Sequence, residues 1–461
     1  MQTHGQGHLR RFAGELDAHA RALLEAEIAG LDLDLLDELV TTLVRSDDGV
    51  AAAPGDVRAP AVWREREMPE DVRAAAVRAG EDALRRGEVA VVMVAGGDGT
   101  RLGSDCPKGT YPIGPVSGAS LFQIHAEKVF ALSRRYGRTV PFLIMTGPGN
   151  HDATEAFFDD HDRFGLEHLR LFRQGTMPAV DSDGRILLSE RGRLALCPDG
   201  HGGLLTALAA SPGGAASCLD ELHGMGVRTL FSFQVDNPLT VVADPLFIGL
   251  HRLQGAEMST KVVEKTDPAE RVGVVVEADG RTRLIEYSDL PEGLAQARAG
   301  DGRLALRAGS IAIHLFELGL VGRLAADPHG LPFHRAWKRV SYVDAAGTPI
   351  EPEAANAFKF ERFVFDALPL AEGPVVVLEV LREEEFEPLK NATGEASPAT
   401  VRERMAELSR RWLAAAGARF EHAPPDAPPA VEISPMWALD AAEVAGRLEP
   451  GTVFDRPTYL R

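Results

Sequence analysis

The sequence predicts an α/β fold in which helices cover both faces of a mainly parallel sheet. The apolar run at residues 89–95 is rich in β-branched side chains and ends at glycine, which is typical of a fully buried parallel strand. Segments with helical spacing then alternate with further apolar runs, at residues 140–145 and 227–233. An acidic residue, Asp236, follows the last of these runs, on the side where open α/β sheets bind ligands.

The first part of the chain is predicted to be helical. Leu9, Phe12 and Leu16 recur at helical spacing, and a helix at residues 69–86 leads directly into the first strand. We interpret residues 1–85 as a helical region that packs as a cap or lateral bundle on the domain that contains this strand.

The loop after the first strand has the composition of a phosphate-binding loop. It reads GGDGTRLGSDCPKG over residues 96–109. Its glycines let the backbone turn tightly and approach a ligand, and Arg101 and Lys108 are donors for phosphate oxygens. The Walker A pattern fails because no Lys-Ser or Lys-Thr follows a glycine, and the GxGxxG pattern fails because its third glycine falls on Leu102. The loop therefore predicts a polyphosphate site of another kind.

Two motifs farther along the chain extend this site. Gln174 lies at the expected end of a third strand, and PDGHGG at residues 198–203 is a second glycine-rich turn that precedes a helix. Either this turn contacts a ligand or it is a plain turn, because PDG is common turn chemistry. Asp236 is placed to hold Mg²⁺ with phosphate oxygens, although an Asx turn or a helix cap would also use an aspartate there.

A hairpin and an aromatic-rich segment complete the candidate site. Two short strands at residues 273–277 and 283–286 surround an Asp-Gly turn, and the pair could form the floor of a sugar pocket with Glu286 accepting hydrogen bonds from hydroxyl groups. The alternative for Glu286 is a solvated strand charge. AFKFERFVFD at residues 357–366 sets Lys359 between aromatic side chains; a charged face beside a buried one fits the same pattern.

Composition and charge exclude several classes of protein. The chain has 461 residues, a hydrophobic content of 45% and a net charge of −19, from 49 basic and 68 acidic residues. Such a charge argues against nucleic acid or an anionic membrane as the main partner. Three cysteines give neither a disulfide framework nor a zinc spacing. Together with the lack of a signal peptide and of a bilayer-spanning apolar run, they predict a cytoplasmic protein.

The last segment carries one clear strand, at residues 375–380, and one amphipathic helix, at residues 398–416. We therefore predict an N-terminal helical region (1–85), a catalytic domain (86–370) and a small C-terminal α+β domain (371–461).

Taken together, these motifs resemble those of the eukaryotic-type UDP-N-acetylglucosamine pyrophosphorylases, within the UDP-sugar pyrophosphorylase family. The resemblance covers almost the whole chain and follows the family's order: GGDGTRLG with PKG, then PDGHGG, VDNPLTVVADPLFIG, KVVEKTDP, IEYSDL, AFKFERFVFD, EVLREEEFEPLKNA and VEISP. It implies a Rossmann-like nucleotidyltransferase domain of the GT-A-like type. It also implies an enzyme that makes a UDP-sugar and pyrophosphate from UTP and a sugar 1-phosphate, with N-acetylglucosamine 1-phosphate as the expected sugar.

The resemblance implies a role for each matching residue. Arg101, Lys108 and Lys359 hold the reacting phosphates, and Asp236 binds the nucleotide and Mg²⁺, the implied cofactor. The other implied nucleotide contacts are Ala95, Gly96, Gly97, Gln174 and Gly200, and the implied sugar contacts are His201, Gly273, Glu286 and Ser310.

Two positions depart from the family pattern and leave the sugar open. His201 stands where the family's glycine-rich turn carries Asn, and Ser310 stands where a sugar-pocket Asn is expected. Because a GHG turn also resembles that of glucose-1-phosphate uridylyltransferases and broad-specificity UDP-sugar pyrophosphorylases, these activities are the alternative. A catalytically silent UDP-sugar sensor and a nicotinamide-dependent dehydrogenase are the alternatives outside this chemistry. The expected partners are UTP and a sugar 1-phosphate, without nucleic acid or membrane, and the expected state is a monomer or weak homo-oligomer.

Overall fold

The computed structural model describes residues 4–46, 55–103, 106–421 and 429–461, and the chain divides into two compact units. Unit 1 comprises Met1–Ala53, Gln174–Ala207 and Ala326–Asp366. Unit 2 comprises Pro54–Arg173, Leu208–Ala325 and Ala367–Arg461. Each unit has a hydrophobic core of its own.

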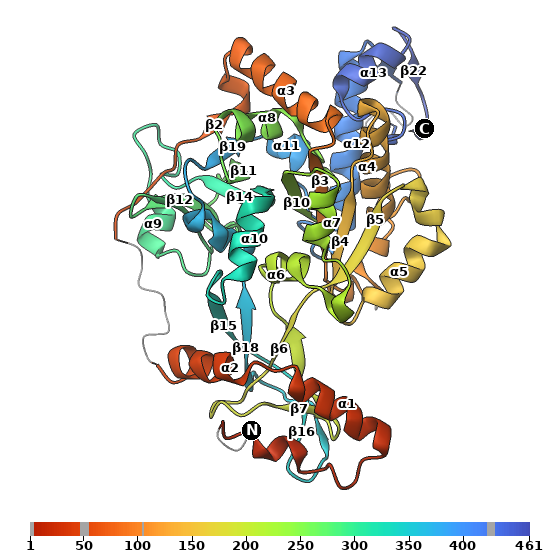
Figure 1. Ribbon diagram of the computed structural model, residues 1–461. Helices are drawn as coiled ribbons and strands as arrows, with labels where there is room; N and C mark the ends of the chain where they lie inside the picture. Colours follow the sequence, from red (N-terminus) through yellow and green to blue (C-terminus); the bar gives the residue numbers. More distant parts are fainter. Residues whose placement is uncertain (1–3, 47–54, 104–105, 422–428) are drawn as a thin grey trace. The chain divides into compact units, whose positions relative to one another are not determined.

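Unit 2 is built around one sheet of eleven strands (Figure 1). Along its main path all neighbouring strands are parallel, except that β14 is antiparallel to both of its neighbours, β11 and β10. The path runs through β2 (Trp63–Arg64), β19 (Val376–Glu379), β11 (Met258–Glu264), β14 (Ala308–Glu317), β10 (Thr229–Gln234), β3 (Val89–Ala95), β4 (Phe142–Thr146) and β5 (Leu169–Arg173). From β14 the sheet continues into β12 (Val274–Ala278), which pairs with β13 (Arg281–Ile285) and β1 (Val57–Arg58).

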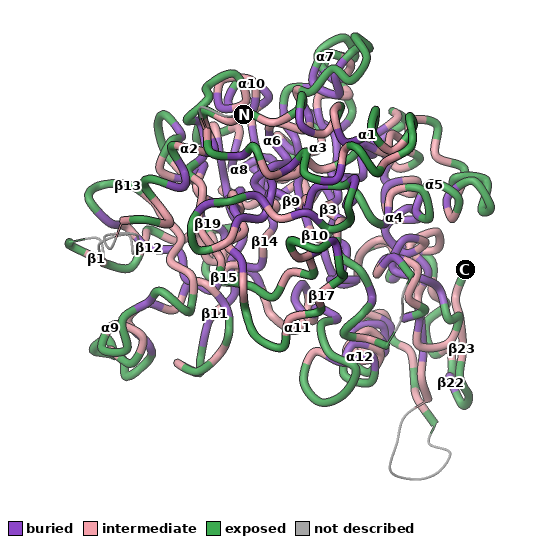
Figure 2. The backbone as a smooth tube through the Cα atoms, turned by 90° about the horizontal axis from the view of Figure 1, so that it is seen from below, coloured by how far each residue is buried: buried purple, intermediate pink, exposed green. Residues whose placement is uncertain are grey.

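The central strands are buried almost from end to end, which explains their apolar sequences. In β3 every residue except Val94 is buried, and all of β4 is buried. Figure 2 shows the same concentration of buried backbone along β3, β10 and β14. A sheet covered on both faces needs no alternation of polar and apolar side chains. The predicted α/β class with a mainly parallel sheet is confirmed, and the first strand has the predicted bounds.

Helices flank this sheet where helical spacing predicts them. α3 (Glu70–Arg85) leads into β3, and α4 (Leu121–Tyr136) begins after Ser120, whose hydroxyl accepts the Gln123 N–H as an N-cap. The other helices of unit 2 are α5 (His151–Asp160), α7 (Cys218–Gly224), α8 (Pro245–Leu253), α9 (Glu292–Gln296), α10 (Leu318–Ala326, which ends one residue outside it), α11 (Arg382–Glu385), α12 (Pro398–Ala415) and α13 (Ala441–Arg447). Across the described ranges, no helix combines the length and the apolar character that crossing a membrane requires.

The C-terminal end of unit 2 has a small core between α12 and α13. Here β20 (Arg419–Phe420) pairs with β22 (Val453–Phe454), and β21 (Val431–Ile433) pairs with β23 (Thr458–Leu460). The predicted boundary at residue 371 does not mark the start of this part, because β19 inserts into the large sheet between β2 and β11.

Unit 1 joins the N-terminal helices to two distant segments of the chain. α1 (Ala18–Ala29) and α2 (Leu33–Leu39) share a core with β7 (Leu188–Glu190), β8 (Arg193–Leu194) and β18 (Ala357–Arg362). The other elements of this unit are β6 (Thr176–Pro178) paired with β9 (Leu196–Pro198), β15 (Phe333–Lys338) paired with β18, β16 (Tyr342–Val343) paired with β17 (Pro349–Ile350), and α6 (Gly203–Ala209), which ends two residues outside it.

The single helical region predicted at residues 1–85 is therefore divided between the units. α1 and α2 belong to unit 1, whereas α3 belongs to unit 2. Helical spacing shows which face of a helix is apolar, but it does not encode which strands that face will meet.

Helices α3 and α8 approach so closely that only glycine fits at their contact. A Cβ atom at Gly80 would lie 1.9 Å from the Pro245 carbonyl oxygen, and one at Gly249 would lie 1.7 Å from the Ala76 carbonyl oxygen. No side-chain rotation relieves either clash, because both partners are backbone atoms.

Gly249→Ala is expected to destabilise the protein by about 2 kcal/mol or more, since α8 must move away from α3. The matched control is Gly322→Ala in α10, where the new Cβ would lie 3.5 Å from Leu219 Cδ2, an ordinary contact. That control is expected to be neutral or to stabilise by about 0.5–1 kcal/mol, the usual effect of replacing a mid-helix glycine. Urea unfolding measures both free energies, and equal shifts in the two variants would contradict the close helix contact.

Candidate active site

The loop after β3 closes on itself through backbone hydrogen bonds. The Lys108 N–H donates to the Gly97 carbonyl at 3.3 Å, and the Gly99 N–H donates to the Cys106 carbonyl at 3.1 Å. Lys108 then opens a single 3₁₀ turn. One loop thus contains both the predicted phosphate cation Lys108 and the predicted backbone contacts at Gly96 and Gly97.

Asn150 holds the start of that loop, and it is a residue that the sequence analysis missed. Its Nδ2 donates to the carbonyl oxygens of Ala95 and Gly97, both at 3.2 Å, and its Oδ1 accepts the Gly147 N–H at 2.8 Å. The residue is 3% exposed. A Cβ atom at Gly147 would lie 2.6 Å from the Gly96 carbonyl oxygen, so this close approach also requires glycine. An Asn just before a helix has the pattern of an ordinary cap, which gave no sign of this role.

Lys108 and Asp236 form an ion pair at one edge of the sheet. The Lys108 Nζ lies 3.0 Å from the Asp236 Oδ2, and the two side chains are 16% and 12% exposed. Lys108 follows β3 and Asp236 follows β10, and these strands are parallel neighbours, so their carboxyl ends meet at the same edge. An Asx turn or a helix cap would need a backbone N–H that donates to the Asp236 carboxylate. Among the described residues no backbone N–H does so, which argues against both alternatives.

The backbone around Asp236 is held by the segment that follows α11. The Leu389 N–H donates to the Asp236 carbonyl at 2.8 Å. Asn237, which is 4% exposed, donates from Nδ2 to the Glu385 carbonyl at 2.6 Å and accepts the Glu387 N–H at 3.2 Å. The motif EVLREEEFEPLKNA therefore positions the Asp236 turn.

A second contact ties β21 to the chain after the phosphate loop. Glu432 accepts the backbone N–H groups of Val116 and Ser117, each at 2.7 Å, and the Ser117 hydroxyl at 2.6 Å. Its side chain is buried. The motif VEISP thus supplies a carboxylate with a positioning role, which the sequence analysis did not assign.

Arg101 lines an open cleft in unit 2 with a volume of 1510 Å³. Members of two segments, residues 266–272 and 382–407, form most of the rest of the wall, together with Tyr287. The wall carries both signs of charge, and its other cations are Arg271, Arg382, Lys390 and Arg404. The carboxylates of the wall outnumber these cations, and Arg382 and Arg404 form ion pairs with three of them, so the charge of the wall does not by itself indicate a phosphate ligand.

Three of the four predicted sugar residues lie together at the β12 end of the sheet. The Ser310 N–H donates to the Gly273 carbonyl at 2.9 Å. A Cβ atom at Gly273 would lie 3.5 Å from Glu286 Oε1, so Glu286 is also a neighbour. The strands β12 and β13 form the predicted hairpin around Asp279 and Gly280.

In unit 1, the second glycine-rich turn packs on β18. The Gln174 Nε2 donates to the Gly200 carbonyl at 2.5 Å. Cβ atoms at Gly200 and Gly202 would lie 2.4 Å and 2.6 Å from backbone atoms of Arg362, whose guanidinium pairs with Asp199 at 2.6 Å. Close packing on Arg362 is therefore one reason for the glycines of PDGHGG.

His201 is enclosed by aromatic rings within unit 1. Its imidazole stacks on Phe363 at a centroid distance of 5.4 Å, lies 5.5 Å from Phe365, and accepts the Val364 N–H at Nδ1. Burial lowers the pKa of His201 to about 4, and the nearby His334 adds to this effect. The ring is therefore neutral at pH 7 and carries its proton on Nε2.

Lys359 lies on β18 beside Cys197 of β9. Burial raises the pKa of the Cys197 thiol, and the charge and hydrogen bond of Lys359 act in the opposite direction. The neighbouring Phe360 is 1% exposed in the core of unit 1, so an aromatic side chain does anchor the strand that carries the lysine.

The donor chemistry of unit 2 fits a magnesium ion that is held together with a phosphate substrate. No group of three or more His, Cys, Asp or Glu side chains able to hold a metal occurs in the part of the chain that the structure describes. Mg²⁺ needs only one or two protein carboxylates when phosphate oxygens and waters complete its octahedral shell. Asp236, beside Lys108, is a carboxylate that meets this requirement.

A glycine-rich loop, a lysine and a carboxylate at the carboxyl edge of a parallel sheet are the features of a nucleotidyltransferase, and the chain belongs to this class of enzyme. Residues 64–417 match the family described as UTP–glucose-1-phosphate uridylyltransferase, and the chain is a member of that family.

The three similar proteins described next match from 74% to 100% of the chain. The human protein named UDP-N-acetylhexosamine pyrophosphorylase-like protein 1 is 38% identical, over 100% of this chain and 96% of its own length. The UDP-N-acetylglucosamine pyrophosphorylase of Saccharomyces cerevisiae is 40% identical, over 74% of this chain and 73% of its own length. The crystal structure of the uridine diphosphate N-acetylglucosamine pyrophosphorylase from Trypanosoma brucei superposes with a TM-score of 0.78 at 25% identity, over 98% of this chain and 97% of that one.

Asn150→Asp is expected to loosen the phosphate loop. The carboxylate still accepts the Gly147 N–H, but it offers an oxygen where Ala95 and Gly97 need a donor. We expect a loss of about 2 kcal/mol in unfolding free energy, because the buried Ala95 carbonyl loses its Asn150 donor, the more exposed Gly97 carbonyl keeps only the Lys108 N–H, and both face a charge.

Chemical denaturation measures this loss, and Asn391→Asp is the matched control. Its amide also donates to a carbonyl, of Glu395 at 2.8 Å, but this bond is exposed and water can replace it, so the expected change is within about 0.5–1 kcal/mol. Titration of UTP is expected to show weaker binding by Asn150→Asp. Unchanged stability and unchanged UTP affinity would show that Asn150 does not hold the loop.

Proposed function

We propose that this protein transfers a uridylyl group from UTP to N-acetylglucosamine 1-phosphate, which gives UDP-N-acetylglucosamine and pyrophosphate. The observation that supports this most is the Lys108–Asp236 pair beside the glycine-rich loop. It combines a donor for phosphate oxygens with a carboxylate suited to Mg²⁺, at the edge where a sheet of this kind binds nucleotides. The yeast relative, at 40% identity, bears the name of this activity.

The proposed reaction is an in-line displacement at phosphorus. A phosphate oxygen of the sugar 1-phosphate attacks the α-phosphorus of UTP, a new P–O bond forms, and the bond from the α-phosphorus to the bridging oxygen breaks as pyrophosphate leaves. The attacking phosphate is largely ionised at neutral pH, since its second pKa is about 6. No general base is therefore required, and catalysis consists of holding two anions in line and neutralising charge.

Different residues of the chain are assigned to different parts of the two substrates. We assign Arg101 and Lys108 to the UTP phosphates and the backbone of Ala95–Gly97 to uracil and ribose. Mg²⁺ held by Asp236 would neutralise charge on the departing pyrophosphate. The resemblance further assigns Lys359 to the reacting phosphates, and Gln174 and Gly200 to uracil.

The sugar is assigned to the cluster of Gly273, Glu286 and Ser310. The second candidate function is uridylyl transfer to glucose 1-phosphate or to several sugar 1-phosphates. Two observations favour it: the description of the matching family names glucose 1-phosphate, and His201, which packs against Phe363 and Phe365, is bulkier than the Asn of the family pattern. The three cysteines, which form no disulfide, support a cytoplasmic location.

A panel of sugar 1-phosphates with UTP and Mg²⁺ tests these proposals, with pyrophosphate release as the readout. We expect the highest kcat/KM with N-acetylglucosamine 1-phosphate. His201→Asn is expected to raise the preference for this substrate over glucose 1-phosphate by about tenfold, the scale on which one altered pocket contact discriminates. His329→Asn, whose side chain is 71% exposed, is the matched control and is expected to leave the ratio unchanged.

A higher kcat/KM with glucose 1-phosphate would favour the second candidate. No pyrophosphate from any member of the panel would refute both and leave a UDP-sugar-binding protein without turnover.

A further inference from the structure

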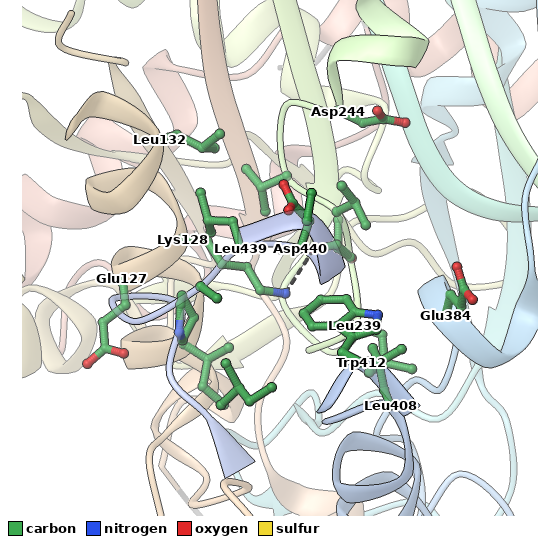
Figure 3. Close-up of a pocket in the computed structure, with 18 of the residues that line it drawn as sticks. Glu127, Lys128, Leu132, Leu239, Asp244, Glu384, Leu408, Trp412, Leu439 and Asp440 are labelled. Atoms are coloured by element: carbon green, nitrogen blue, oxygen red, sulfur yellow. Dashed lines mark hydrogen bonds between the residues drawn. The ribbon is translucent and has the colours of Figure 1, made fainter. Parts of the chain in front are cut away.

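Unit 2 contains a second cavity, and none of the residues that line it is among those assigned to the nucleotide or the sugar. Its volume is 530 Å³, which falls within the range of about 300–1,000 Å³ that holds a small organic ligand. The wall combines α3 and α4, the chain from Pro238 to Leu246, and α12 with the strands near the C-terminus. Figure 3 shows apolar side chains around it, among them Leu132, Leu239, Leu408 and Trp412.

Lys128 of α4 extends into this cavity (Figure 3). Its Nζ donates to the carbonyl oxygens of Pro238 at 2.5 Å and of Thr240 at 2.9 Å. An ammonium group has three donors, so one remains after these two bonds. Within the described residues, that donor has no acceptor, and no carboxylate lies within salt-bridge distance of Lys128.

The other charges on the wall are already satisfied. Glu65, Glu81, Asp244, Glu384 and Asp440 each form an ion pair with an arginine or a lysine. Glu127 and Glu432 accept hydrogen bonds from neutral groups. The arginines of the wall, Arg73 and Arg135, take part in these pairs. Lys128 is thus the cation on the described wall that lacks a counter-charge, whereas the carboxylates Glu127 and Glu432 are paired only with neutral donors.

The partly apolar surroundings make this positive charge costly. Lys128 is partly buried, which lowers its pKa to about 7, and the more distant Glu385 carboxylate only partly offsets that effect. His125, one turn earlier on α4, has its own pKa lowered to about 3 by burial and by the charge of Lys128. A negatively charged ligand group at the third N–H of Lys128 would stabilise the ammonium form, as water does for a lysine at the protein surface.

We propose that this cavity binds a small organic anion with an apolar, aromatic body, whose charged group pairs with Lys128. The apolar body fits the leucine and tryptophan wall, and a single negative charge fits the one unpaired cation. This proposal does not depend on the proposed function, because its test measures ligand binding and not catalytic turnover.

The site is also connected to Asp236. The two carbonyls that Lys128 holds, of Pro238 and Thr240, follow Asp236 by two and four residues. An anion at the third donor of Lys128 would therefore bind the same ammonium group that holds the loop after Asp236.

Two fluorescent probes of matched shape test the site in the full-length protein: anilinonaphthalene sulfonate, an aromatic monoanion, and N-phenylnaphthylamine, its uncharged analogue. Lys128→Met is expected to weaken binding of the anionic probe by about tenfold or more and to leave the neutral probe within about twofold. Lys128→Arg, which keeps the charge, is expected to retain the anionic probe. Binding of the neutral probe also reports that the Met variant keeps a folded cavity.

Energy transfer from tryptophan locates the bound probe. Trp412→Phe is expected to reduce transfer to the anionic probe, because Trp412 lines the cavity. Three outcomes would each overturn the proposal: no binding of the anionic probe, an equal effect of Lys128→Met on both probes, or transfer that does not depend on Trp412.

Discussion

The ion pair between Lys108 and Asp236 is the contact on which the rest of the candidate site depends. Two unit charges 3.0 Å apart attract by about 5.5 kcal/mol at an effective dielectric constant of about 20, before the cost of desolvation is subtracted. The pair links the loop after β3 to the turn after β10, so the two groups assigned to phosphate and metal stand at one edge of the sheet. In the proposed function, a triphosphate bound by the lysine would therefore lie beside the carboxylate.

Hydrogen bonds from distant parts of unit 2 fix the backbone on both sides of this pair. Asn150 holds the phosphate loop, Asn237 ties the Asp236 turn to the segment after α11, and Glu432 holds the chain that follows the loop. The C-terminal part of the chain thus holds the backbone around the candidate site in place. This arrangement explains why the late motifs EVLREEEFEPLKNA and VEISP can matter to an enzyme without contributing reacting groups.

The features that could be predicted from the sequence are those with a local signature. A buried parallel strand, a glycine-rich loop and an acidic residue after a strand are local patterns, and the shared edge of parallel strands brings Lys108 and Asp236 together. Asn150 and Glu432 were missed because one has the pattern of a helix cap and the other that of a strand charge. Glu432 meets its partners across more than 300 residues of sequence, and the grouping of α1 with β18 is equally non-local, so no periodicity reveals either.

A double-mutant cycle on kcat/KM for UTP tests the coupling of the ion pair most directly, with Lys108→Ala, Asp236→Asn and the double variant. Each single change is expected to cost about a hundredfold or more, since each removes a group that neutralises charge on the same phosphates. Because the two groups act as one unit, the double variant is expected to be little worse than the poorer single variant. Losses that multiply, as for independent sites, would contradict the central role given to this pair.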